Sequence, residues 1–223
     1  MKLAALFSGG KDSTYSAYLA GKGGHNISIF ACIKPARQDS YMFHSVNINM
    51  VPLAAEAQGK PLASAPSSGE KETEVEDLRQ LIELLHVDGV VSGAIASSYQ
   101  RDRVNAVCRA LGIAHLSPLW DRPPAEVLSA EIKSGMEIVM THVAAAGLDR
   151  SWLGRRIDNG AAEELGKLSE RYGLNVCGEG GEYETLVVDA PWFIKRIETT
   201  RTEIIWEGTS GTYRIHEARL VPK

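Results

Sequence analysis

The sequence predicts an α/β fold, in which a parallel sheet with helices on both faces precedes a smaller α+β domain. In the first half of the chain, short apolar runs alternate with helix-like stretches, as βαβ units require. Three prolines within residues 118–127 interrupt this alternation. Beyond them, residues 192–221 show the alternation typical of antiparallel strands. We therefore expect a first domain over residues 1–120 and a second over residues 121–223.

The elements of the first half follow from apolar periodicity. Short apolar or extended runs predict strands at residues 2–7, 26–33, 61–66 and 88–95. Longer segments with helix-like patterns predict helices at residues 13–21, 47–59, 72–87 and 98–112. Pro52 interrupts the second of these helices.

The second half contains fewer elements. Pro124 suits the first turn of a new helix, because its fixed φ and missing N–H are tolerated there. Residues 137–146 are strand-like, and residues 159–173 are helix-like and end in a stop glycine. A hairpin is expected around residues 209–211 within the last strands.

The composition indicates a globular protein of a reducing compartment, and we expect a cytoplasmic location. The chain has 223 residues, of which 44% are hydrophobic and 23% charged, enough for a sizeable core. Its net charge of −4 favours neither stable nucleic-acid binding nor an anionic membrane. No apolar run approaches the length of a membrane span. Cys32, Cys108 and Cys177 match no zinc spacing and are expected to be buried free thiols.

A glycine-rich loop, SGGKDS at residues 8–13, follows the first predicted strand and opens the first helix. Such a loop is an anion site, because glycines let backbone N–H groups approach phosphate oxygens and the helix dipole favours negative charge. The common nucleoside-triphosphate loop does not match, since Ala5 and Asp12 stand where its first glycine and its Ser/Thr belong. An ordinary capped turn is the alternative, but it has little need of Lys11 and Asp12.

Residues 8–13 resemble the PP-loop, S-G-G-x-D-S, of the ATP pyrophosphatase group. The resemblance implies a nucleotide-binding domain of the HUP, or adenine nucleotide alpha hydrolase-like, type. It also implies cleavage of ATP between its α- and β-phosphates, with AMP attached to an acceptor oxygen. In that scheme Ser8, Gly9, Gly10 and Ser13 cradle phosphates, Lys11 neutralises charge and Asp12 helps to hold Mg²⁺.

Two further stretches narrow the resemblance. They are residues 92–113, continuing into 117–120, and residues 177–191, which include the run GEGGEYET. Together with the PP-loop they resemble the diphthine–ammonia ligase family, in its compact archaeal type. The resemblance implies that the carboxylate of diphthine on translation elongation factor 2 is adenylated by ATP and then amidated to diphthamide, with release of AMP and pyrophosphate. The chain carries no glutaminase features, so free ammonium is the expected nitrogen donor.

The expected site residues come from the PP-loop and from these two stretches. We expect catalytic roles for Lys11, Asp12, Glu182 and Glu184, and we assign substrate binding to Tyr99, Arg103, Glu179, Gly180, Gly181, Glu182, Tyr183 and Glu184. Three carboxylates within six residues, separated by glycines, favour a binding role over a solvated loop.

Individual assignments leave alternatives open. Tyr183 is expected to face the trimethylammonium group of diphthine, with packing of the loop as the alternative. Arg103 is expected to hold a phosphate or carboxylate, with a solvated arginine as the alternative. Gly93 is counted as ATP-binding, because a missing side chain lets a nucleotide approach the sheet edge.

Two other functions compete with this interpretation. A PP-loop ligase that modifies tRNA is disfavoured by the absence of paired cysteines and by the acidic balance of the chain. A regulatory module that binds ATP without turnover is the second alternative. A homodimer is compatible with a chain of this length.

Overall fold

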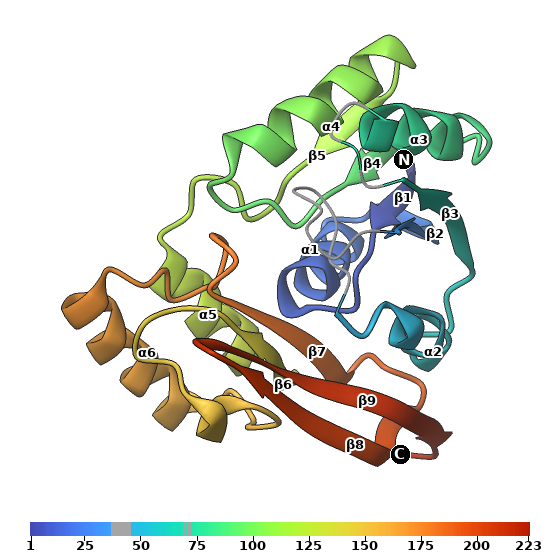
Figure 1. Cartoon of the computed structure of the whole chain (residues 1–223). Coiled ribbons are helices and arrows are strands. Elements are labelled where there is room, and N and C mark those ends of the chain that lie inside the picture. The colour runs from blue at the N-terminus through green and yellow to red at the C-terminus, as the bar shows by residue number, and fades with distance from the viewer. Residues whose placement is uncertain (37–45, 69, 71–72) are drawn as a thin grey trace.

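The protein contains two sheets, as a computed structural model shows (Figure 1). The structure describes residues 1–36, 46–68, 70 and 73–223. A five-stranded parallel sheet has the order β3-β2-β1-β4-β5, and a four-stranded antiparallel sheet has the order β7-β6-β9-β8. The predicted combination of a parallel α/β part and a smaller α+β part is confirmed.

The first sheet and its helices occupy the N-terminal half. Its elements are β1 (Lys2–Leu6), α1 (Lys11–Lys22), β2 (Asn26–Pro35), η1 (Ile48–Met50), α2 (Val51–Ala57), β3 (Leu62–Ser67), α3 (Thr73–Glu83), β4 (Gly89–Val91), α4 (Ser98–Ala110) and β5 (Ala114–Leu116). The second sheet and its helices follow, as α5 (Pro124–Lys133), β6 (Glu137–Val143), η2 (Arg150–Trp152), α6 (Asn159–Tyr172), β7 (Tyr183–Asp189), β8 (Arg196–Glu207) and β9 (Ser210–Val221).

The parallel sheet is covered on both faces, with α3 and α4 on one side and α1 and α2 on the other (Figure 1). Strand β1 shows why. Leu3 and Ala5 point into the core shared with α1 and α2, whereas Ala4 points into the core beneath α3 and α4. The core on the α1 side continues into the second sheet through residues such as Ile138 and Met140. Helices α1 and α2 therefore join the two sheets.

Some local predictions differ from the structure. Pro52 does not interrupt a long helix; it occupies the first turn of α2, directly after the short η1, where its missing N–H costs nothing. The hairpin turn lies at residues 208–209, just before the predicted position, because Gly208 supplies the positive φ of 60°. Strand β5 escaped prediction because its three residues are only half-buried and carry little periodicity.

Two observations concern composition. Cys32, Cys108 and Cys177 are buried free thiols, as predicted. Within the described residues, no helix is long and apolar enough to cross a membrane.

Candidate functional site

The glycine-rich loop connects the end of β1 to the start of α1. Gly9 has a φ of +79°, a backbone conformation that favours glycine. A side chain at Gly10 would lie 3.3 Å from the Thr185 carbonyl oxygen, so β7 closes one side of the loop. The Ser13 hydroxyl accepts the Ser8 backbone N–H at 3.3 Å and lies 3.2 Å from the Ser8 hydroxyl. The loop thus brings two hydroxyls and the start of α1 to one point, a suitable arrangement for phosphate oxygens.

A pocket of about 420 Å³ opens in front of this loop. Its lining includes the loop itself, the turn after β4 with Ser92 and Gly93, and the acidic loop, which we define as residues 177–182, together with the start of β7. Residues of β2, η1, α3 and α4 also line it. The pocket lies at the carboxyl ends of β1 and β4, where parallel sheets usually bind ligands. Its volume lies in the range of small-molecule sites.

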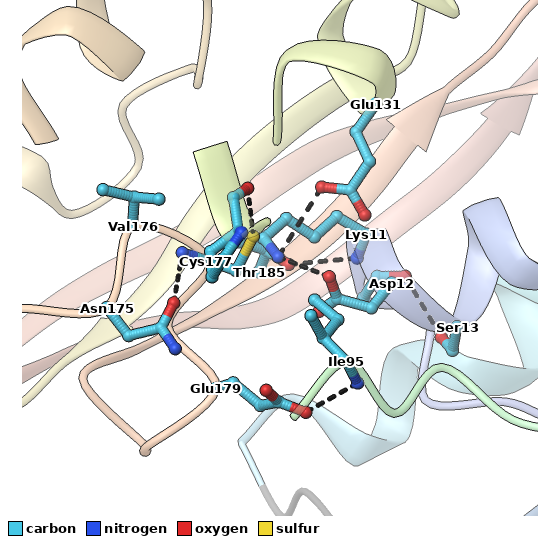
Figure 2. Close-up of polar contacts among 12 residues, drawn as sticks. Lys11, Asp12, Ser13, Ile95, Glu131, Asn175, Val176, Cys177, Glu179 and Thr185 are labelled. Atoms are coloured by element: carbon cyan, nitrogen blue, oxygen red, sulfur yellow. Dashed lines mark hydrogen bonds and ion pairs between the residues drawn. The ribbon is translucent and has the colours of Figure 1, made fainter. Parts of the chain in front are cut away.

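Lys11 is buried beneath the loop, with 1% of its surface exposed. Its Nζ atom lies 2.5 Å from Asp12 Oδ1 and 3.6 Å from Glu131 Oε2 (Figure 2). Burial by itself would lower the pKa of Lys11, but the Asp12 and Glu131 carboxylates raise it well above its ordinary value. The sequence predicted a Lys11 that neutralises phosphate charge; the structure places its ammonium group between two carboxylates.

Glu131 is a residue that the sequence reasoning missed. It lies on α5 and is fully buried, and its carboxylate lies beside the Lys11 ammonium group and the Asp12 carboxylate. Burial raises the pKa of Glu131 well above its ordinary value, with Lys11 opposing and Asp12 reinforcing the shift. Val127, Leu128 and Glu131 share the buried face of α5. A carboxylate on the apolar face of a helix was the signal that could have found it.

Glu179 ties the acidic loop to the turn before α4. Its carboxylate accepts the backbone N–H groups of Ile95 at 2.7 Å, of Ala96 at 2.6 Å and of Ser97 at 3.0 Å. Figure 2 shows the Ile95 bond reaching across to the acidic loop. Ser97 is the N-cap residue of α4, so the carboxylate occupies the positive end of that helix.

Glu182 and Tyr183 are engaged within the acidic loop and its surroundings. Glu182 accepts the backbone N–H groups of Gly180 at 2.7 Å and Asn175 at 3.1 Å. Tyr183 is only 3% exposed and its hydroxyl donates to the Val176 carbonyl at 2.6 Å. The Lys11 Nζ atom lies 5.8 Å from the centre of the Tyr183 ring. The ring therefore packs over the buried ammonium group of this chain.

The remaining predicted residues divide into two groups. Gly180, Gly181 and Glu184 line the pocket. Tyr99 and Arg103 lie on α4 but are not among the described residues that line it, although Gln100 and Val104 of the same helix are. The Arg103 guanidinium stacks on the Tyr99 ring at 3.5 Å.

Gly93 lines the pocket, and its missing side chain also serves a packing contact within the chain. A Cβ atom there would lie 2.9 Å from the Asp12 carbonyl carbon and 2.9 Å from the Ser13 nitrogen. The turn after β4 therefore packs directly on the backbone of the glycine-rich loop, and the missing side chain serves this contact.

Cys177 also lines the pocket. Its thiol donates to the Pro124 carbonyl at 3.0 Å, and burial raises the pKa of Cys177 to about 12. The thiol stays protonated at neutral pH and is unsuited to act as a nucleophile.

Comparisons with known proteins show the family of the chain. Residues 1–115 match the family model of the diphthamide synthase N-terminal domain, and residues 124–221 match that of its C-terminal domain. The chain is 40% identical over 232 residues to a diphthine–ammonia ligase of Danio rerio, covering 92% of this chain and 89% of that protein. It is 38% identical over 228 residues to the Homo sapiens protein of the same name, covering 92% and 85%. A third relative of that name, from Schizosaccharomyces pombe, is 37% identical over 231 residues, covering 95% of this chain and 38% of that protein. The two family models together span almost all residues of this chain, and the chain belongs to the diphthamide synthase family.

Proposed function

We propose that the protein is an ATP-dependent ligase that adenylates the carboxylate of diphthine and amidates it with ammonium. The observation that carries the proposal is the meeting of two loops at one pocket in a chain of this family. The phosphate loop, residues 8–13, and the acidic loop, residues 177–182, both line that pocket. The diphthine is carried by a protein substrate, which we take to be translation elongation factor 2.

The reaction has two steps. In the first, an oxygen of the diphthine carboxylate attacks the α-phosphorus of ATP, the bond to the β-phosphate breaks, and pyrophosphate leaves. In the second, ammonium loses a proton to water, the nitrogen of the resulting ammonia attacks the carbonyl carbon of the acyl adenylate, and the carbon–oxygen bond to AMP breaks. AMP leaves with the bonding electron pair, and the excess proton passes to water.

The phosphate loop supports the first step. Backbone N–H groups at the start of α1 and the hydroxyls of Ser8 and Ser13 offer donors to phosphate oxygens, and Gly9 and Gly10 allow the close approach. These donors stabilise the charge that develops as pyrophosphate departs.

Asp12 fits a magnesium ion that arrives with ATP. Its side chain is 32% exposed and lines the pocket. Mg²⁺ usually takes one or two protein carboxylates and completes its shell with phosphate oxygens and water. The described residues contain no cluster of three or more His, Cys, Asp or Glu side chains that would hold a metal by themselves. A bound Mg²⁺ would spread the negative charge of the phosphates, and Asp12 would hold it there.

The other candidate catalytic residues act around the same pocket. Lys11 supplies a fixed positive charge beneath the phosphate loop, and Asp12 and Glu131 hold it in place. Glu182 shapes the acidic loop through its two backbone contacts. Glu184, which lines the pocket, faces the cationic substrate.

The test is the release of pyrophosphate and AMP in three parallel reactions. One contains elongation factor 2 that carries diphthine, one contains tRNA, and one contains neither. Product release with the modified factor and ammonium, together with incorporation of isotope-labelled ammonium into that factor, is the expected result. Turnover with tRNA would favour a tRNA-modifying ligase, and ATP binding without turnover in all three would favour a regulatory module. The Asp12→Ala variant, with its circular dichroism spectrum unchanged, is the inactive control.

A further inference from the structure

A chain of hydrogen bonds runs behind the pocket and is not part of either loop. The Ser92 hydroxyl lies 2.8 Å from His115 Nε2, and His115 Nδ1 lies 2.7 Å from Asn105 Oδ1. The Ser117 hydroxyl lies 3.2 Å from both Ser92 Oγ and His115 Nε2. Ser92 follows β4, His115 and Ser117 belong to β5 and its end, and Asn105 lies on α4. Three neighbouring elements thus hold one serine hydroxyl.

The direction of each hydrogen bond follows from its partners. The Asn105 carbonyl oxygen only accepts, so His115 carries its proton on Nδ1 and has an accepting lone pair on Nε2. The contact of Ser92 with His115 Nε2 is shorter than that of Ser117, so the Ser92 hydroxyl donates to Nε2. The Ser117 hydroxyl then donates to Ser92 Oγ. The Ser92 proton therefore points away from the pocket. One lone pair on Ser92 Oγ remains for a ligand that donates a hydrogen bond.

Ser92 is the member of this chain of hydrogen bonds that lines the pocket. Gly93, the next residue, packs against the backbone of Asp12 and Ser13. Ser92 therefore stands beside the phosphate loop, where the proposed function expects the phosphates of ATP to bind.

Because Ser92 has only an accepting lone pair free, its ligand must be a hydrogen-bond donor. Phosphate and carboxylate oxygens only accept, so they gain nothing from Ser92. Donors on ATP belong to the ribose and the adenine, and neither takes part in the bonds that form and break. Among the reactants, the nitrogen nucleophile is the donor that must reach the reacting end.

We propose that Ser92 accepts a hydrogen bond from ammonia and orients it for attack, with His115 and Asn105 as positioning residues. The inference rests on the proposed function. The new bond joins the ammonia nitrogen to the carbonyl carbon of the acyl adenylate, as the bond to AMP breaks. An N–H of ammonia points to Ser92 Oγ, so that the nitrogen lone pair can face the carbon. The excess proton passes to water, and His115 stays neutral throughout.

The surroundings of His115 favour this neutral form. Burial, together with the positive charge of Arg101, lowers the pKa of His115 to about 4. At neutral pH its Nε2 is therefore always an acceptor, which keeps the Ser92 proton turned inward.

The experiment separates the two steps of the reaction. The Michaelis constants for ammonium chloride and for ATP are measured in the full reaction, and adenylation is followed by ATP–pyrophosphate exchange without ammonium. Ser92→Ala should raise the Michaelis constant for ammonium about tenfold, as expected for loss of one hydrogen bond between neutral groups, and leave exchange and the constant for ATP unchanged. Ser92→Thr, which keeps the hydroxyl, should stay near the wild type. His115→Phe should raise the constant for ammonium in the same direction.

Ser28→Ala is the matched control, because the Ser28 hydroxyl donates to the Leu3 carbonyl in the same sheet, and Ser28 is not among the described residues that line the pocket. Thermal unfolding of each variant shows whether it folds; if Ser92→Ala does not, the comparison of Ser92→Thr with His115→Phe decides. An unchanged constant for ammonium, or an equal rise in the constant for ATP, overturns the inference. A wild-type protein that performs exchange but never uses ammonium overturns the proposed function as well, so the two failures are distinguishable.

Discussion

The Glu179 carboxylate accepts the backbone N–H of Ile95 at 2.7 Å and so fastens the acidic loop to the segment that starts α4. The sequence suggested that this carboxylate binds the substrate. In the structure it accepts hydrogen bonds from three consecutive backbone N–H groups of this chain. Both segments line the pocket. Glu179 therefore sets the distance between two pocket walls.

Removal of this contact should loosen the pocket without unfolding the protein. Glu179→Ala is expected to raise the Michaelis constant for ATP roughly tenfold, since charge-assisted hydrogen bonds are lost while the core stays intact. Glu179→Gln keeps one accepting oxygen, so its Michaelis constant for ATP should lie between those of the wild type and Glu179→Ala. Glu170, exposed on α6, gives the control Glu170→Ala. Steady-state kinetics and limited proteolysis of the acidic loop measure the effect; equal constants for Glu179→Ala and Glu170→Ala would contradict it.

The buried contact of Lys11 with Glu131 predicts a strong dependence of stability on Lys11. Lys11→Met leaves the Asp12 and Glu131 carboxylates without their shared cation. We expect the free energy of unfolding to fall by about 3 kcal/mol, because loss of one partner from a buried ion pair is costly. The double variant Lys11→Met/Glu131→Leu should recover much of this loss, since it removes one buried acid. Urea unfolding measures all three proteins, and a double variant no more stable than Lys11→Met would refute the coupling.

The contact of Gly93 with the phosphate loop predicts that even a methyl group disturbs ATP binding. In Gly93→Ala the Cβ would lie 2.9 Å from backbone atoms of Asp12 and Ser13, which cannot turn aside like a side chain. We expect a loss of stability of about 1–3 kcal/mol and weaker ATP binding. Gly166→Ala is the matched control, because Gly166 lies within α6 with nothing within 4 Å of its Cβ position. That variant should gain about 0.5–1 kcal/mol. Calorimetry with ATP and urea unfolding compare the pair.

The sequence predicts those parts of the candidate site that depend on residues close together in the chain. The phosphate loop could be predicted because its motif lies between an apolar run and a helical segment, both readable from neighbouring residues. The composition of the acidic loop predicted that it belongs to the site, but it did not predict the partners of its carboxylates. Glu179 and Glu182 bind backbone N–H groups, and any residue except proline supplies such a group.

The remaining features depend on tertiary contacts. Glu131 reaches the phosphate loop because α5 packs close to α1, and the chain of hydrogen bonds behind Ser92 forms because β5 lies beside β4. Neither neighbour is encoded by spacing along the chain. Strand β5, with three residues, was too short to predict, so His115 could not be placed beside Ser92.

The neutral form of His115 predicts a loss of stability in acid. Burial and Arg101 hold the pKa of His115 at about 4 in the folded protein, below its ordinary value of 6.5. Between these two pH values His115 binds more protons in the unfolded chain than in the folded one, so its contribution to the free energy of unfolding falls as the pH falls from 6.5 to about 4. His115→Gln cannot take up this proton. It should be less stable than the wild type at neutral pH, where its altered hydrogen bonds with Asn105 and Ser92 count most, and the difference should shrink steadily as the solution is acidified. Urea unfolding of both proteins over this pH range measures the difference, and a constant gap would show that His115 is already charged in the folded state or titrates normally.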